Sequence, residues 1–138
     1  MSTASPAVGP ATPPKPWMIW TGRVLSAIPV LLFVVGGSFS FKPSPQMLEG
    51  MGKFGWQESS LPLIATLEIC CAVLYIIPRT AVLGAILMTA YLGGAVATHL
   101  RVGDPMYPFA ILMAIFVWGG LYWRDARIRE LIPLTRAR

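Results

Sequence analysis

Long apolar stretches separated by short polar connections run through most of the chain. Four of them carry a single charged residue between them and are 18 to 20 residues long: Val24–Phe41, Ser60–Ile77, Ala81–Leu100 and Met106–Trp123. An α-helix rising 1.5 Å per residue needs about 20 residues to cross an apolar bilayer core of about 30 Å. The pattern predicts an all-α membrane protein, a four-transmembrane-helix bundle with spans at about residues 17–41, 60–77, 81–100 and 106–123.

The connections predict how these helices are joined. Residues 78–80 and 101–105 are short enough to make antiparallel hairpins of their flanking helices, whereas residues 42–59 form a longer loop. In that loop Ser44 precedes Pro45, which is typical of a helix N-terminus. The apolar residues that follow fall on one side of a helix, so we expect a short interfacial helix lying on the bilayer in this first outer loop.

The two ends of the chain differ from its centre. Residues 1–16 are rich in Pro, Ser, Thr and Ala and contain one charge, so we expect a disordered tail. Residues 17–134 would form the membrane domain, and residues 135–138 a basic cytoplasmic end.

Composition and charge support lipid as the solvent. Only 12% of the residues are charged and 55% are hydrophobic, against about 25% charged in a soluble domain. The net charge of +5 does not predict nucleic-acid binding, because the basic residues gather at the ends of the apolar stretches. Eight flank one side and three the other, which places both termini in the cytoplasm. The eight are Lys15, Arg23, Arg79, Arg124, Arg127, Arg129, Arg136 and Arg138, and the three are Lys42, Lys53 and Arg101.

Glu68 is the one charged residue inside a predicted span. A charged side chain at the bilayer centre costs about 2.5–3.5 kcal/mol on insertion scales, so such residues face the bundle interior and have a partner or a function. Glu68 lies about 12 Å below the outer start of its helix, and Tyr91 about 13 Å below the outer end of the next. The matched depths predict a Glu68–Tyr91 hydrogen bond, which would serve either as a structural pin between two helices or as part of a ligand site.

Three further polar residues lie near the outer end of the third span. Thr98 shares a helix face with Tyr91, and His99 and Arg101 lie at the outer interface. One interpretation makes His99 and Arg101 an interfacial anchor, with Asp104 as the nearest acidic partner of Arg101. The other makes them the rim of a pocket with Glu68 at its floor, gripping an anionic or quinone-like head group. One histidine with two distant carboxylates does not predict a metal site.

Small residues and cysteines complete the candidate chemistry. Gly94 is expected to let another helix approach closely beside Tyr91. Cys70 and Cys71 are adjacent on one helix and point about 100° apart, which opposes a bridge between them. They would be either buried small apolar residues or a redox-active dithiol.

The chain resembles a known family in a set of motifs. These are Gly22–Arg23, Leu67–Glu68, Pro78–Arg79–Thr80, the run from Tyr91 to Pro105, and Trp118–Gly119–Gly120–Leu121–Tyr122. Together they resemble the DoxX-like family of small bacterial integral membrane proteins, over residues 18–134. The resemblance implies a four-helix membrane bundle in the bacterial inner membrane. The founding member of that family is a small membrane subunit of a thiosulfate:quinone oxidoreductase, and other relatives are linked to membrane redox or thiol stress, but the resemblance implies little about the mechanism of this chain. It suggests Glu68, Thr98, His99 and Arg101 as a candidate polar site.

Three functions remain open at this point. The leading one is a small membrane subunit that binds a quinone or another amphipathic ligand in the outer half of the bundle, with ligand-binding candidates Glu68, Tyr91, Thr98, His99 and Arg101. The second is a membrane enzyme that uses Glu68 for proton transfer on a lipid-like substrate. The third is an assembly partner or small transporter in which Glu68 only pins helices. Expected partners are the lipid bilayer and either a second copy of the chain or another subunit.

Overall fold

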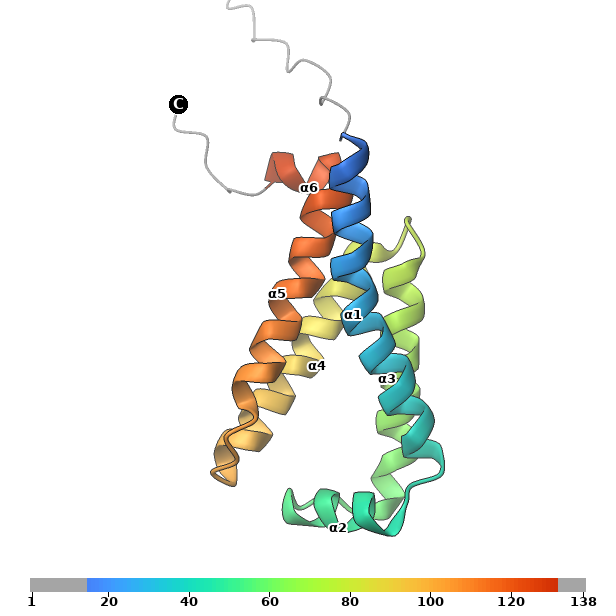
Figure 1. The fold of residues 1–138 in the computed structure, drawn as a ribbon. Helices are drawn as coiled ribbons and strands as arrows, with labels where there is room; N and C mark the ends of the chain where they lie inside the picture. Colours follow the sequence, from blue (N-terminus) through green and yellow to red (C-terminus); the bar gives the residue numbers. More distant parts are fainter. Residues whose placement is uncertain (1–14, 132–138) are drawn as a thin grey trace, which may run out of the picture.

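The computed structural model describes residues 15–131, and in this part every regular element is a helix (Figure 1). The predicted tail lies outside it except for its last two residues, and the predicted basic end lies wholly outside it. The first helix begins at Pro16, one residue earlier than predicted. The elements are α1 (Pro16–Phe41), α2 (Pro45–Lys53), the short 3₁₀ helix η1 (Glu58–Ser60), α3 (Leu61–Ile76), α4 (Ala81–Arg101), α5 (Tyr107–Arg124) and α6 (Ala126–Leu131).

Three of the described helices are long and apolar enough to cross a membrane: Pro16–Phe41, Glu58–Ile76 and Ala81–Arg101. Many of their Leu, Val and Ile side chains point outward, including Leu31, Leu63 and Ile86. An apolar surface of this extent is unfavourable in water and favourable against lipid chains. The protein is therefore a multi-pass helical membrane protein. The helix α5, predicted as the fourth span, is not among the three.

Local sequence signals explain where the helices begin. Pro16, Pro45, Pro62 and Pro108 each lie in the first two positions of a helix, where a missing N–H costs no intrahelical hydrogen bond. The short helix of the first long loop is present as predicted. The Ser44 side chain caps it by accepting a 3.2 Å hydrogen bond from the Met47 backbone N–H, and it ends shortly before Gly55, whose φ is +81°.

Each of the four long helices packs against two of the others. The helix α1 contacts α3 and α5, and α4 contacts the same two helices. Figure 1 shows these four helices converging toward the end that carries α6 and the start of α1, and diverging toward the opposite end, which α2 lies across. The broad end is the one that holds the candidate site residues.

The convergent end is held by a buried tyrosine and by glycines. The Tyr75 hydroxyl donates to the Val117 carbonyl at 2.7 Å and lies 2.9 Å from the Ser26 hydroxyl. Arg124 donates to the Tyr75 carbonyl at 3.1 Å and stacks over its ring. A Cβ added at Gly84 would overlap the Tyr75 backbone. Tyr75 is therefore fixed from α1, α4 and α5 at once.

Candidate functional site

Glu68 and Tyr91 form the expected contact between α3 and α4. The Tyr91 hydroxyl donates to Glu68 Oε1 at 2.5 Å. The second carboxyl oxygen, Oε2, is buried and has no hydrogen-bond partner among the described residues. Buried polar atoms in native proteins almost always have partners, so an orphaned one points to a missing water, ion or ligand.

The helix α1 completes the surroundings of this carboxyl. Gly36 faces it, and a Cβ at this position would lie 3.4 Å from Glu68 Oε2. One residue on, Gly37 packs so tightly on α3 that a Cβ would come within 3.0 Å of the Ala65 carbonyl. The Phe33 ring meets the Tyr91 ring edge-to-face, with centroids 5.1 Å apart. The two adjacent glycines therefore have different roles. Gly37 allows the close approach of α1 to α3, and Gly36 leaves space beside the Glu68 carboxyl.

A cavity of about 260 Å³ adjoins Glu68, and we call it the inner cavity. All four long helices contribute to its wall, which is apolar apart from Glu68, Tyr91 and His99. Its lining residues are Leu32, Phe33, Gly36, Glu68, Tyr91, Leu92, Ala95, His99, Met106, Phe109 and Ala110.

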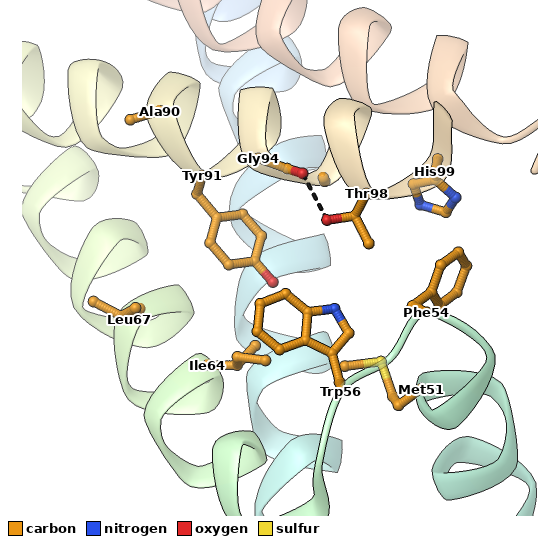
Figure 2. Close-up of a pocket in the computed structure, with 11 residues that line it drawn as sticks. Met51, Phe54, Trp56, Ile64, Leu67, Ala90, Tyr91, Gly94, Thr98 and His99 are labelled. Atoms are coloured by element: carbon orange, nitrogen blue, oxygen red, sulfur yellow. Dashed lines mark hydrogen bonds between the residues drawn. The ribbon is translucent and has the colours of Figure 1, made fainter. Parts of the chain in front are cut away.

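A second cavity, of about 380 Å³, lies on the other side of α4 between α3, α4 and the segment that follows α2 (Figure 2). We call it the lateral cavity. Figure 2 shows the Trp56 ring between Ile64 and Leu67 of α3 and Thr98 of α4, with Met51, Phe54 and His99 at one end. Leu67 and Ala90 in its wall are exposed on the outside of the bundle. The lateral cavity therefore opens where lipid would lie.

The two cavities share a wall. Tyr91, Ala95 and His99, which follow one another at four-residue intervals along α4, line both. The inner cavity has the carboxyl, and the lateral cavity has most of the aromatic surface. A ligand with a polar head and an apolar body finds both kinds of surface within one helix diameter.

At the broad end, His99 and Arg101 have partners that the sequence did not predict. His99 Nδ1 lies 3.4 Å from Asp104 Oδ1, and the His99 ring packs edge-to-face on Phe54. Arg101, expected to pair with Asp104, instead donates to the Phe54 carbonyl at 2.5 Å. It lines a separate hollow of about 320 Å³ that shares Phe54, Trp56 and Thr98 with the lateral cavity. Arg101 thus ties the segment after α2 to the end of α4.

The structure groups the five candidate residues in two sets rather than one. Glu68, Tyr91 and His99 meet at the inner cavity, whereas Thr98 lies with Tyr91 and His99 at the lateral cavity and Arg101 outside both. The Thr98 hydroxyl donates to the Gly94 carbonyl of its own helix at 2.9 Å. The expectation that Gly94 packs against another helix is wrong. A Cβ there would meet no atom within 4 Å, because Gly94 faces the lateral cavity.

Sequence reasoning missed the aromatic side of the lateral cavity. Trp56 and Phe54 follow α2, and an aromatic residue near the end of a membrane helix is ordinarily interpreted as an interface anchor. Nothing in the sequence around them signals that this segment folds back against α3 and α4.

Cysteines and metal ligands add nothing to this site. Cys70 is exposed on the outside of α3 and Cys71 is buried in the core, and both are free. Within residues 15–131, no group of three or more His, Cys, Asp or Glu side chains is placed to hold a metal ion.

The fold and the site together define a multi-pass helical membrane protein with a half-buried glutamate beside the inner cavity. Comparison with protein families assigns it further, because the model of the DoxX-like family matches residues 24–120. The chain belongs to the DoxX-like family, which confirms the prediction from its motifs. No curated protein and no solved structure matches the chain.

Proposed function

We propose that this DoxX-like protein is a small membrane subunit that binds a quinone or another amphipathic ligand in the outer half of its bundle, as part of a redox-linked assembly. The observation that carries the proposal is Glu68 Oε2, a buried carboxyl oxygen without a partner in the described residues, next to a cavity walled by four helices. A head group that hydrogen bonds to this oxygen would relieve the cost of leaving it unpaired.

The apolar wall of the lateral cavity favours an amphipathic ligand rather than a small polar one. Its wall is formed largely by Met51, Phe54, Trp56, Ile64 and Leu67, and it opens on the outside of the bundle. An apolar tail can lie there or continue into the bilayer, since the burial of each CH₂ group contributes about 0.8 kcal/mol.

The topology proposed with this function has four spans and both termini in the cytoplasm of a bacterial cell, within the inner membrane. The helix α5 is proposed as the fourth span, because it packs against α1 and α4 and runs beside α4 toward the broad end (Figure 1). The excess of basic residues at the convergent end favours a cytoplasmic location for that end.

Mass spectrometry of small molecules that co-purify in mild detergent tests this function. The wild type is compared with Glu68→Gln and with the control Glu58→Gln, which changes an exposed glutamate of η1. We expect a stoichiometric quinone, quinol or isoprenoid with the wild type and the control, and a changed or lost ligand with Glu68→Gln. Bulk phospholipid alone in all three preparations would contradict the proposal.

A second candidate function is structural, with Glu68 as a packing pin in an assembly partner or small transporter. The Glu68–Tyr91 hydrogen bond and the close approach at Gly37 favour it, because they join α1, α3 and α4 at one level. In that case Glu68→Gln would lower the free energy of unfolding while no ligand was found in any preparation.

A further inference from the structure

The position of Glu68 in the inner cavity also bears on which chemical form of a ligand is bound. Tyr91 occupies Oε1, so a head group in the inner cavity has Oε2 as its available hydrogen-bonding atom on this carboxyl. Glu68 and Gly36, which faces Oε2, both line the inner cavity, and the terminal torsion of a glutamate is broad, so the carboxyl can adjust to a head group there.

A carboxyl oxygen changes its hydrogen-bonding role with one proton. When Glu68 is ionised, Oε2 only accepts hydrogen bonds, and when Glu68 is protonated at this oxygen it donates one. A ring carbonyl only accepts hydrogen bonds and therefore matches the protonated form alone, whereas a ring hydroxyl can donate to the ionised form and can also accept from the protonated form. The one mismatched pair is the ionised carboxylate with a ring carbonyl, because both groups are acceptors and both are left unpaired.

We propose that Glu68 Oε2 is the head-group contact of the inner cavity, and that its proton selects between the carbonyl and the hydroxyl form of a ring head group. A benzoquinone is bound when Glu68 is protonated, whereas only the corresponding hydroquinone is bound when Glu68 is ionised. The inference rests on the proposed function, and it adds the atom that makes the contact and the form of ligand it accepts. It concerns binding alone and involves no electron transfer.

The other groups that face this carboxyl do not obscure the effect. From α4 come Tyr91, which already donates to Oε1, and His99, which lines the same cavity. On α3 the nearest titratable neighbour is Cys71, which is buried. The α1 and α5 residues of the wall are apolar. His99 is therefore a side chain of the wall whose contribution to binding must be separated from that of Glu68.

Glu68→Gln is the decisive variant because it fixes the role of Oε2. With Tyr91 still donating to the amide oxygen, the amide NH₂ takes the place of Oε2 and is a permanent donor. The variant is expected to accept the carbonyl form at every pH. Pairing Glu68→Gln with the wild type also identifies any contribution of His99, which both proteins retain.

The experiment measures, by anaerobic calorimetric titration in detergent, the dissociation constants of a short-chain alkyl benzoquinone and of its hydroquinone between about pH 5.5 and 8.5. In the wild type the preference should move toward the hydroquinone as the pH rises, by up to about tenfold per pH unit, the limit for linkage to one proton. In Glu68→Gln the quinone should still bind at every pH, and the preference between the two forms should not change with pH.

Gly36→Ala provides a second route that does not alter the carboxyl. Its methyl group would lie 3.4 Å from Oε2, in ordinary van der Waals contact, so the fold should keep its stability. The methyl group would occupy space in the inner cavity beside Oε2 and keep a head group of either form from its hydrogen bond, so both forms should bind more weakly by about tenfold or more. A wild-type preference that does not change with pH, or a change that persists in Glu68→Gln, would overturn the inference while the binding function stands. If neither form binds the wild type, the proposed function itself fails for this ligand class.

Discussion

Replacing Tyr91 by phenylalanine tests whether the Glu68–Tyr91 contact serves a ligand or only the fold. The substitution removes one hydroxyl, leaves the ring against Phe33, and deprives Glu68 Oε1 of its 2.5 Å donor. Both carboxyl oxygens would then lack a partner among the described residues. The matched control is Tyr75→Phe, which removes a buried hydroxyl from the convergent end, outside both cavities.

The magnitudes follow from the partners of each hydroxyl. A hydrogen bond to a charged group contributes about 1.5–3 kcal/mol in soluble proteins, but interhelical hydrogen bonds in membranes average about 0.6 and reach about 1.7 kcal/mol. The membrane values apply here, so Tyr91→Phe should lower the free energy of unfolding by about 0.6–1.7 kcal/mol. Tyr75→Phe loses two contacts, to Val117 and Ser26, and should cost about 1–3 kcal/mol.

The assay combines unfolding in a denaturing detergent with ligand retention in a mild one. Both variants should unfold at lower denaturant than the wild type. Only Tyr91→Phe should also lose the bound ligand or weaken it markedly, because only Tyr91 holds the carboxyl in place. Equal loss of ligand in Tyr75→Phe would refute the reasoning, since the effect would then come from general destabilisation. Unchanged retention in Tyr91→Phe would reduce this contact to a structural pin.

Two further predictions concern packing and capping. Gly84→Ala should lower the free energy of unfolding by about 1–3 kcal/mol or more, because its methyl group would overlap the Tyr75 backbone. The control Gly93→Ala lies in open space on the same helix and should leave the free energy of unfolding unchanged or raise it slightly. Equal effects of the two substitutions would contradict the close packing of α4 on α3 at Gly84. Ser44→Ala should cost α2 about 1 kcal/mol by removing its cap, seen as about fivefold faster hydrogen exchange of its amides, while Gln46→Ala should not change the exchange.

Several parts of this molecule could be predicted because the signals are local. The apolar stretches, the Ser44–Pro45 helix start and the depth match of Glu68 with Tyr91 depend only on helix geometry and sequence spacing. The packing face of α3 was equally readable, since Ala65 and Tyr75 share a helix side and both are buried. Helical periodicity places side chains at known depths and angles before any tertiary contact is known.

Other parts could not be predicted because they depend on where the segment between α2 and α3 packs against the long helices. The lateral cavity exists because Trp56 and Phe54 fold back against α3 and α4, and Arg101 secures that position through a backbone carbonyl. A backbone carbonyl carries no sequence signature, so an acidic side chain such as Asp104 is the natural but incorrect choice. The division of the site by α4 likewise depends on how four helices pack together.

The unequal packing along the bundle has a mechanical consequence. Backbones approach most closely at the convergent end, where Gly22 and Gly120 bring α1 against α5 and Gly84 brings α4 against α3. The cavities lie toward the other end, where the helices diverge. Any opening that admits a ligand therefore pivots about a stiff base and displaces the helices most at the broad end. Exchange of ligand would then proceed through one membrane leaflet, with the opposite leaflet sealed throughout.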